Sequence, residues 1–339
     1  MPRPVWPGNK RFAFSIIDDT DVATEENVLP IYRLLERLGM RATKTVWPVG
    51  CPEGSRDFGT SRTLEDSAYL DFVRDLHGRG FEITWHGATM ESSTRERTIT
   101  ALERFRDAFG AYPRLHANHA RNRENLYWGA DRVDTALLRA LVRRLGASPC
   151  VVYEGHVERS RYWWGDLCLQ HIEYVRNLTF NDVNLLRVNP SMPYHDPARP
   201  LVRWWFSACD AEDAAAFADL LRPENQDRLE AEGGVCIVAT HFGKEFVRDG
   251  LVNPIVEERL AALARRPGWF PAVGELLDHL RVSRTTSLLP AREWRRMQWR
   301  WVRDLATRRL RRRRIERSGD RLGSFPRNFS GYVRNSRNV

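Results

Sequence analysis

The segment RFAFSIIDDT, residues 11–20, decides the fold, because an apolar strand runs there directly into acidic side chains. Residues 11–17 are rich in Phe and Ile and predict a β-strand. Asp18 and Asp19 follow this strand at once, and Thr24 with the two glutamates behind it predicts the start of a helix. The chain therefore begins with a strand, an acidic exit and a helix.

The same succession of strand and helix recurs up to about residue 280. The first helix ends at Gly39, after apolar residues at helical spacing. Further strands are predicted at residues 42–46, 81–85, 115–118, 150–153, 202–208, 235–239 and 269–273. Further helices are predicted at residues 69–76, 93–109, 133–145, 211–221, 224–231, 254–265 and 275–280. Alternation of this length is typical of the α/β class, a mostly parallel sheet covered by helices.

This pattern divides the chain into a body and a tail. For residues 1–282 we predict a (β/α) barrel, distorted or incomplete, which fits better than an open sheet, although the sequence alone leaves both open. Residues 154–200 are rich in aromatic residues and proline and lack periodicity, so we interpret them as an insertion within the barrel. Residues 283–339 form an arginine-rich tail.

The composition places limits on the class of protein. With 339 residues, of which 42% are hydrophobic and 29% charged, the chain has the composition of a globular protein. Its first residues lack the apolar core of a signal peptide, and no run of about 18 apolar residues predicts a membrane span. The five cysteines are widely spaced and form no CxxC pair, which argues against a disulfide framework and a thiolate zinc site. We therefore expect a cytoplasmic protein.

Histidines follow later strands in the way that the two aspartates follow the first strand. They are His86, His116, His119 and His241. The carboxyl ends of parallel barrel strands lie on one face, so these side chains are expected to converge there. Asp and His are suitable ligands for a zinc-like ion, and a spare carboxylate can act as a general base. The pattern therefore predicts a metal-dependent hydrolytic site.

Four motifs resemble those of the polysaccharide deacetylase family, the NodB-homology group of carbohydrate esterases. They are FSIIDDT at residues 14–20, EITWHGATM at residues 82–90, VATH at residues 238–241 and WFPAVGELL at residues 269–277. The resemblance covers residues 11 to about 280 and implies a NodB-like barrel that hydrolyses an N-acetyl group, a C–N amide bond, on a sugar.

The resemblance also assigns roles to individual residues. It implies that Asp18 is the base and that His241 protonates the leaving amine. It implies that Asp19 and His86 bind a divalent metal ion, for which zinc is the expected identity. One position departs from the family, because the second motif histidine is replaced by Met90. His116, His119 and Asp21 are the candidates to complete the metal site.

The substrate implied by the resemblance is a carbohydrate. Trp163 and Trp164 lie in the irregular stretch, where their rings could stack on a sugar, although a core position is the alternative. Asn118 and Lys244 follow two of the strands, and we expect them to bind substrate as well.

The tail carries most of the positive charge. Residues 284–339 contain 17 arginines and 4 acidic residues, a net charge of +13, which leaves −4 of the total of +9 for residues 1–283. Residues 291–317 predict an amphipathic helix with Trp294, Met297, Trp301 and Leu305 on one face. Such a helix suits an anionic membrane surface. A helix docked on the barrel is the alternative, and nucleic-acid binding ranks last because no groove-reading motif accompanies the arginines.

Three functions stay open at this point. The first is a deacetylase held at the inner membrane face, acting on a precursor of a surface polysaccharide. The second is a catalytically inactive carbohydrate-binding protein of the same fold, which Met90 makes reasonable. The third is a membrane- or nucleic-acid-binding scaffold that acts through its tail.

Overall fold

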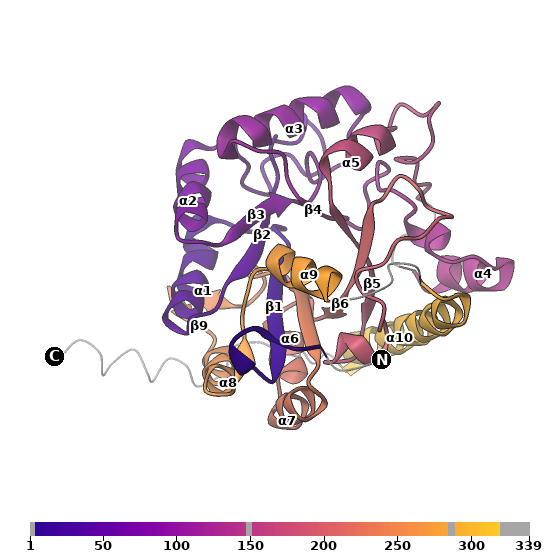
Figure 1. Ribbon diagram of the computed structural model, residues 1–339. Coiled ribbons are helices and arrows are strands. Elements are labelled where there is room, and N and C mark those ends of the chain that lie inside the picture. Colours follow the sequence, from indigo (N-terminus) through magenta and orange to yellow (C-terminus); the bar gives the residue numbers. More distant parts are fainter. Residues whose placement is uncertain (1–3, 147–150, 284–288, 319–339) are drawn as a thin grey trace.

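The structure is a closed parallel barrel surrounded by helices (Figure 1). It is a computed structural model that describes residues 4–146, 151–283 and 289–318, with side chains up to residue 311. The barrel strands are β1 (Phe12–Asp18), β2 (Ala42–Val46), β3 (Glu82–Trp85), β4 (Leu115–Ala117), β5 (Tyr174–Phe180), β6 (Trp204–Asp210) and β7 (Val235–Thr240). They pair in chain order, and β7 pairs with β1 to close the barrel. The predicted barrel is therefore confirmed, and it is complete rather than open.

Helices cover the outside of the barrel. They are α1 (Glu25–Arg37), α2 (Ser67–Gly78), α3 (Arg95–Phe109), α4 (Ala136–Leu145), α5 (Gly165–His171), α6 (Ala214–Leu220), α7 (Pro223–Glu232), α8 (Pro254–Ala264), α9 (Val273–Val282) and α10 (Ala291–Ser318). The first helix starts as its sequence predicts, because the Thr24 hydroxyl accepts from the Asn27 amide while the Asn27 side chain accepts from the Thr24 amide. None of the helices in the described ranges is long and apolar enough to cross a bilayer.

Short elements complete the chain. They are η1 (Pro7–Asn9), η2 (Gly129–Arg132), η3 (Leu185–Arg187), the hairpin β8 (Val247–Arg248) and β9 (Leu251–Val252), and β10 (Gly268–Trp269) beside the start of β1. The strand predicted at residues 269–273 is thus reduced to two residues, because α9 already begins at Val273.

The interpretation of residues 154–200 as an insertion was wrong in one respect. This stretch contains the barrel strand β5 and the helix α5 that leads into it. The strand predicted at residues 150–153 does not form over residues 151–153, and Cys150 lies outside the described residues. Six of the seven residues of β5 are buried, and its sequence, YVRNLTF, places an arginine and an asparagine among apolar residues. That arginine points to a partner inside the barrel.

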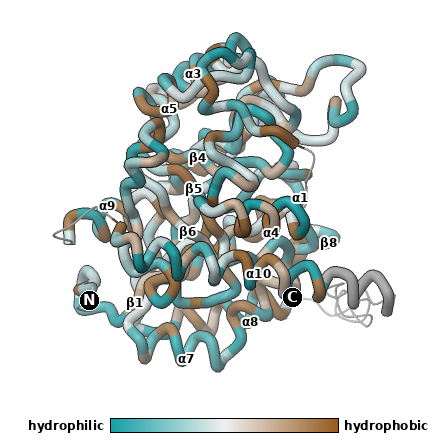
Figure 2. The backbone as a smooth tube through the Cα atoms, turned by 90° about the vertical axis from the view of Figure 1, so that its right-hand side faces the viewer, coloured by the Kyte–Doolittle hydropathy of each residue, from teal (hydrophilic) through white to brown (hydrophobic). Residues whose placement is uncertain are grey.

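The tail helix α10 covers the part of the barrel that lacks a crossover helix. Between β5 and β6 the chain forms only η3, and α10 packs against β5 and α4 instead (Figures 1 and 2). Met297 and Trp301 are fully buried, and the Asp304 carboxylate accepts from the Asn181 amide at 3.0 Å. The apolar face of α10 is therefore used for packing on the barrel, which is the docked-helix alternative.

A buried ion pair joins β1 to β2. The Lys44 ammonium lies 2.9 Å from Asp18 Oδ2, and both side chains are fully inaccessible to water. The same carboxylate accepts from the Tyr32 hydroxyl at 2.8 Å and from the Phe242 amide at 2.8 Å. Asp18 thus connects β1 with β2, α1 and the end of β7.

We expect Lys44→Met to lower the free energy of unfolding by about 3–5 kcal/mol, because it leaves the Asp18 carboxylate buried without its counter-charge. Adding Asp18→Asn should recover part of the loss, since the amide can still accept from the Phe242 amide. Urea unfolding followed by circular dichroism measures both values. Lys10→Met, at an exposed position, is the matched control and should change stability by no more than about 0.5 kcal/mol. If Lys44→Met lowered the free energy of unfolding as little as Lys10→Met does, the Asp18–Lys44 pair would not be needed for stability.

Trp301→Ala should release α10 from the barrel, since the lost side chain is fully buried and its truncation costs about 3–5 kcal/mol. Hydrogen exchange of residues 294–305 should become faster. Trp299→Ala removes the same ring from the exposed side of α10 and should leave this exchange unchanged. Equal exchange in both variants would mean that the helix does not depend on its apolar face.

Candidate functional site

A cluster of acidic and imidazole side chains lies at the carboxyl ends of the strands, where barrel enzymes place their active sites. It consists of Asp19 and Asp21 after β1, His86 after β3, His119 after β4 and His241 after β7. The residues are up to 222 positions apart in sequence, and closure of the barrel through β1 and β7 brings them together.

Asp21 lies at the centre of the cluster. Its Oδ1 is 3.5 Å from His86 Nε2, and its Oδ2 is 3.5 Å from both His119 Nε2 and His241 Nε2. Asp21 Oδ1 and His86 Nδ1 are buried and lack a hydrogen-bond partner among the described residues. Buried polar atoms without partners are costly, so this arrangement points to a ligand between the carboxylate and the imidazoles.

The electrostatics of the cluster favour an ionised carboxylate beside the imidazoles. Burial alone would raise the pKa of Asp21, but the facing imidazoles of His119, His241 and His86 hold this pKa below its ordinary value. Burial lowers the pKa of His86 to about 4, so this imidazole is neutral near pH 7. A neutral imidazole and an ionised carboxylate are the forms in which these residues bind metals.

Asp19 has a separate partner, the buried Arg176 of β5. The guanidinium donates from Nη1 to Oδ1 at 2.9 Å and from Nη2 to Oδ2 at 2.7 Å, a bidentate pair. Burial would raise the pKa of Asp19, but the charge of Arg176 keeps it below its ordinary value. His86 Nδ1 lies 3.8 Å from Asp19 Oδ1, so this carboxylate borders the group around Asp21.

The hydrogen bonds of Asn122 fix the tautomer of His119. Asn122 Nδ2 donates to the Thr89 carbonyl and to Glu124 Oε1, each at 2.9 Å, so its oxygen must face His119 Nδ1, also at 2.9 Å. An amide oxygen can only accept, and His119 Nδ1 therefore carries a proton. In the neutral imidazole, Nε2 is then unprotonated and faces Asp21, as in metal sites where the other ring nitrogen is held by a polar partner. Burial would lower the pKa of His119, but the facing carboxylate of Asp21 raises it above its ordinary value.

His241 is the most exposed member of the cluster, at 15% of its side chain. Its Nδ1 donates to the Glu212 carbonyl at 2.9 Å, which turns Nε2 toward Asp21. Burial would lower the pKa of His241, but the facing carboxylate of Asp21 and the charge of Asp19 raise it above its ordinary value. This histidine is placed to carry a proton at the mouth of the site.

The expected role of Asp18 as base does not fit the structure. Strand pairing persists beyond β1, since the Asp19 amide donates to the Thr240 carbonyl at 2.8 Å. Successive side chains therefore still point to opposite sides, and Asp18 faces Lys44 and Tyr32 while Asp19 faces the barrel interior. Because its side chain is fully buried on the side of β1 that faces Lys44 and Tyr32, Asp18 has no access to a substrate at the barrel mouth.

His116 and Asn118 form a buried pair behind the cluster. His116 Nε2 lies 3.0 Å from Asn118 Oδ1, and the His116 ring packs against Trp85 and Trp164. Asn118 Nδ2 donates to the Arg176 carbonyl at 3.1 Å, so the pair braces β5. Burial lowers the pKa of His116 to about 3. In the described structure neither residue contacts Asp21, which removes His116 from the candidate metal ligands and Asn118 from the candidate substrate contacts.

The expected tryptophan contacts with substrate are also corrected. Trp164 is 1% exposed, packs against Trp85 and donates from its indole nitrogen to the Glu124 carbonyl, so it belongs to the core. Trp163 is half-buried against Gly165 on α5. Lys244 pairs at 3.3 Å with Glu212, the residue whose carbonyl orients His241, and it remains a candidate substrate contact.

A cavity of about 510 Å³ adjoins the cluster through Trp47. The Trp47 ring packs on His86 and His119, with centroids 4.8 and 5.4 Å apart. Met90 also lines this cavity, and its sulfur accepts from the hydroxyls of Thr60 and Ser61 at 3.3 and 3.4 Å. Met90 is therefore part of the cavity wall. His119, and not Met90, faces Asp21 in the cluster.

The donor set fits a divalent metal ion. No group of three or more His, Cys, Asp or Glu side chains in the described ranges is already drawn together at ligand spacing. However, zinc ligands lie about 2.0–2.2 Å from the ion, so two donors of a tetrahedral site are about 3.4 Å apart. The separations of 3.5 Å around Asp21 are close to this value and too long for direct hydrogen bonds.

Sequence reasoning missed Arg176, Asn122 and Trp47. Arg176 could have been found from a lone arginine within an otherwise buried strand, because such a charge needs a partner. Asn122 and Trp47 carry no such signal, since Asn122 lies in a loop and Trp47 directly follows β2 without a polar group that demands a partner inside the barrel.

Comparisons with known proteins agree with this architecture. No family model matches the sequence, and no curated protein matches it significantly. A protein assigned as a polysaccharide deacetylase from Mycobacterium smegmatis superposes with a TM-score of 0.50 and 14% identity, over 86% of this chain and 97% of that chain. The PuuE allantoinase superposes with a TM-score of 0.50 and 14% identity, over 83% and 94% of the two chains. The chain therefore has the barrel fold that these two proteins share, which confirms the fold implied by the motifs and marks the sequence as divergent from both.

Proposed function

We propose that the protein is a metal-dependent hydrolase that removes an N-acetyl or related acyl group from a sugar. The observation that carries this proposal is the Asp21 carboxylate, which faces the imidazoles of His86, His119 and His241 at 3.5 Å each. A second carboxylate, that of Asp19, lies beside this group and forms an ion pair with Arg176. Hydrolysis of an amide needs a place for an ion, a base and an acid, and this set of residues supplies candidates for all three.

In this proposal Asp21, His86 and His119 hold a divalent ion. The tautomer of His119 set by Asn122 presents an unprotonated nitrogen, and the low pKa of His86 keeps its imidazole neutral. When bound, such an ion polarises an amide carbonyl and makes a neighbouring water molecule more acidic. Mixed nitrogen and oxygen donors suit zinc, and the identity of the metal stays a prediction.

The other residues move protons and fix positions. Asp19 is kept ionised by Arg176 and can accept the proton of the attacking water. His241 presents Nε2 toward the cluster because its Nδ1 is held by the Glu212 carbonyl, so its protonated form can donate to the leaving nitrogen. Trp47 covers the rings of His86 and His119 and limits their movement.

The substrate class rests on the shared fold. One structural neighbour is assigned as a polysaccharide deacetylase and the other is an allantoinase, so we propose an acylated sugar and take allantoin as the comparison substrate. The cavity of about 510 Å³ beside Trp47 has room for a small number of sugar units. A catalytically inactive carbohydrate-binding protein is the alternative, and metal content separates the two.

Elemental analysis of the purified protein should find a stoichiometric divalent ion. Asp21→Ala, His86→Ala and His119→Ala should each lose the ion, because each variant removes one of the three proposed protein ligands. His116→Gln is the matched control and should retain the metal, since His116 faces Asn118 instead of Asp21. Thermal unfolding verifies that each variant is folded.

Two results would reject this assignment. Metal lost from the His116 variant but retained by the Asp21 variant would place the ion elsewhere. No bound metal after incubation with zinc, cobalt or nickel would favour the inactive carbohydrate-binding protein.

Asp19→Asn should lower kcat for the preferred acetylated sugar by about 10²–10⁴-fold, since it removes the proposed general base while preserving the shape of the side chain. KM should change little, and the metal content should stay that of the parent. Release of acetate measures the rate. An Asp19→Asn variant that turns over at the parental rate would exclude this carboxylate as the base.

A further inference from the structure

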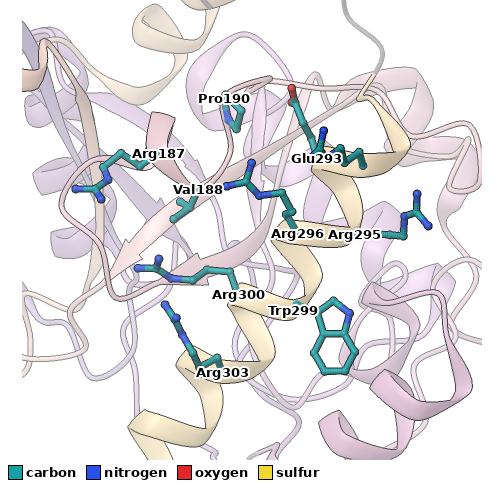
Figure 3. Close-up of a pocket in the computed structure, with 10 residues that line it drawn as sticks. Arg187, Val188, Pro190, Glu293, Arg295, Arg296, Trp299, Arg300 and Arg303 are labelled. Atoms are coloured by element: carbon teal, nitrogen blue, oxygen red, sulfur yellow. The ribbon is translucent and has the colours of Figure 1, made fainter.

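A second cavity, of about 730 Å³, lies on the outside of the barrel, between α10 and the segment after β5 (Figure 3). We name it the arginine groove. Its lining residues are Arg187, Val188, Pro190, Arg292, Glu293, Arg295, Arg296, Trp299, Arg300 and Arg303. None of them lines the cavity beside Trp47, so the arginine groove is separate from the candidate hydrolytic site.

The helix α10 has two faces with different tasks. At 3.6 residues per turn, its arginines and Trp299 in the groove occupy an arc of about 140°. Met297 and Trp301 lie on the opposite arc and are buried against the barrel. Figure 3 shows Arg296, Arg300 and Arg303 reaching from α10 toward the segment that carries Arg187. The arginines therefore form a row along the exposed side of a helix whose other side is fixed.

Much of the positive charge in the arginine groove is not neutralised by the protein. Arg187 pairs with Glu232, and Arg300 pairs with Asp182 and Asp304. By contrast, no carboxylate in the described part of the chain forms an ion pair with Arg292, Arg295 or Arg296.

The lining contains one acidic residue, Glu293, and its carboxylate accepts from the Ser191 hydroxyl at 2.7 Å. Like charges three and four residues apart on a helix repel one another. Arg292, Arg295 and Arg296 thus lack a counter-charge among the described residues, whereas Arg300 and Arg303 have Asp304 nearby.

A bound molecule can supply the counter-charge that the described residues do not. Side chains are not described for residues 1–3, 147–150, 284–288 and 312–339, and the acidic residues among these are Glu316 and Asp320. A bilayer is a poor occupant, since interfacial helices insert an apolar face and that of α10 packs on the barrel. An extended anionic chain can instead lie along the row of guanidinium groups.

We propose that the arginine groove binds an acidic glycan chain, that is, a polysaccharide bearing carboxylate groups; this choice of polymer rests on the proposed function. Guanidinium groups pair with carboxylates in bidentate geometry, and their planar forks favour such groups over neutral hydroxyls. Trp299 is 52% exposed within the row and offers an aromatic face to a sugar ring. The groove thereby holds the polymer on the outer wall, while the hydrolytic site at the barrel mouth acts on the same class of molecule.

Binding of polygalacturonate oligomers to the full-length protein tests this proposal, with neutral dextran oligomers as the comparison ligand. Isothermal titration calorimetry at low salt should detect polygalacturonate binding that weakens as salt is added, and no binding of dextran. Arg292→Gln with Arg296→Gln should weaken the affinity by about tenfold or more, because two charge-assisted contacts are lost. Trp299→Ala should weaken it as well, with an unchanged dependence on salt.

A double variant elsewhere provides the matched control. Arg33→Gln with Arg265→Gln removes the same charge from exposed positions on α1 and after α8, and it should bind polygalacturonate like the parent. An equal loss of polygalacturonate affinity in both double variants would mean that the affinity depends only on the net charge of the protein, and it would overturn the proposal. Binding of single-stranded poly(U) or of phosphatidylglycerol vesicles, but not of polygalacturonate, would overturn it in favour of a nucleic acid or a membrane.

The two proposals can fail separately. Polygalacturonate binding without hydrolysis of any acetylated sugar would reject the proposed hydrolase and leave the arginine groove in place. Hydrolysis of an acetylated sugar together with no binding of polygalacturonate would overturn the arginine groove and leave the hydrolase.

Discussion

The pairing of β7 with β1 is the constraint on which the rest of the structure depends. It joins residues 13–18 to residues 235–240 in continuous register and closes the sheet into a barrel. Asp18, at the end of β1, then accepts from the Phe242 amide just beyond β7 and pairs with Lys44 of β2. One buried carboxylate thus fixes the strand ends that carry Asp19, Asp21 and His241.

A fully buried ion pair is weak evidence for stability, since desolvation of both charges offsets their attraction. The main effect of the Asp18–Lys44 pair is to fix the position of β1 relative to its neighbours. Because Asp18 satisfies Lys44, Tyr32 and the Phe242 amide together, alternative registers of β1 would leave several buried polar groups without partners. The register of β1 decides which acidic side chain faces the barrel interior, so the pair acts on the site without touching a substrate.

The sequence predicted the barrel well because its signals are local. Apolar strands, helix starts and glycine stops recur in order, and β2 and α3 end where the pattern places their ends. The strand β5 was missed because it is only seven residues long and lies between loops rich in prolines and aromatic residues, where no periodic pattern stands out. Convergence of His86, His119 and His241 was predictable from strand ends alone. Arg176 was not, because it reaches Asp19 only through the closed barrel, and the contact of Asn122 with His119 depends on the conformation of the loop after β4.

The resemblance to deacetylase motifs predicted the right residue types with roles displaced along the chain. It assigned the base to Asp18 and a metal ligand to Asp19, on the assumption that the strand bends between them. The strand continues instead, so alternation turns Asp18 outward, Asp19 toward Arg176 and Asp21 toward the imidazoles. In the proposed site, His119, which enters from the β4 exit with its Nδ1 held by Asn122, takes the role that the resemblance gives to a histidine at position 90. The direction in which a side chain points, more than its match to a motif position, therefore determines which residues of this divergent chain can form a hydrolytic site.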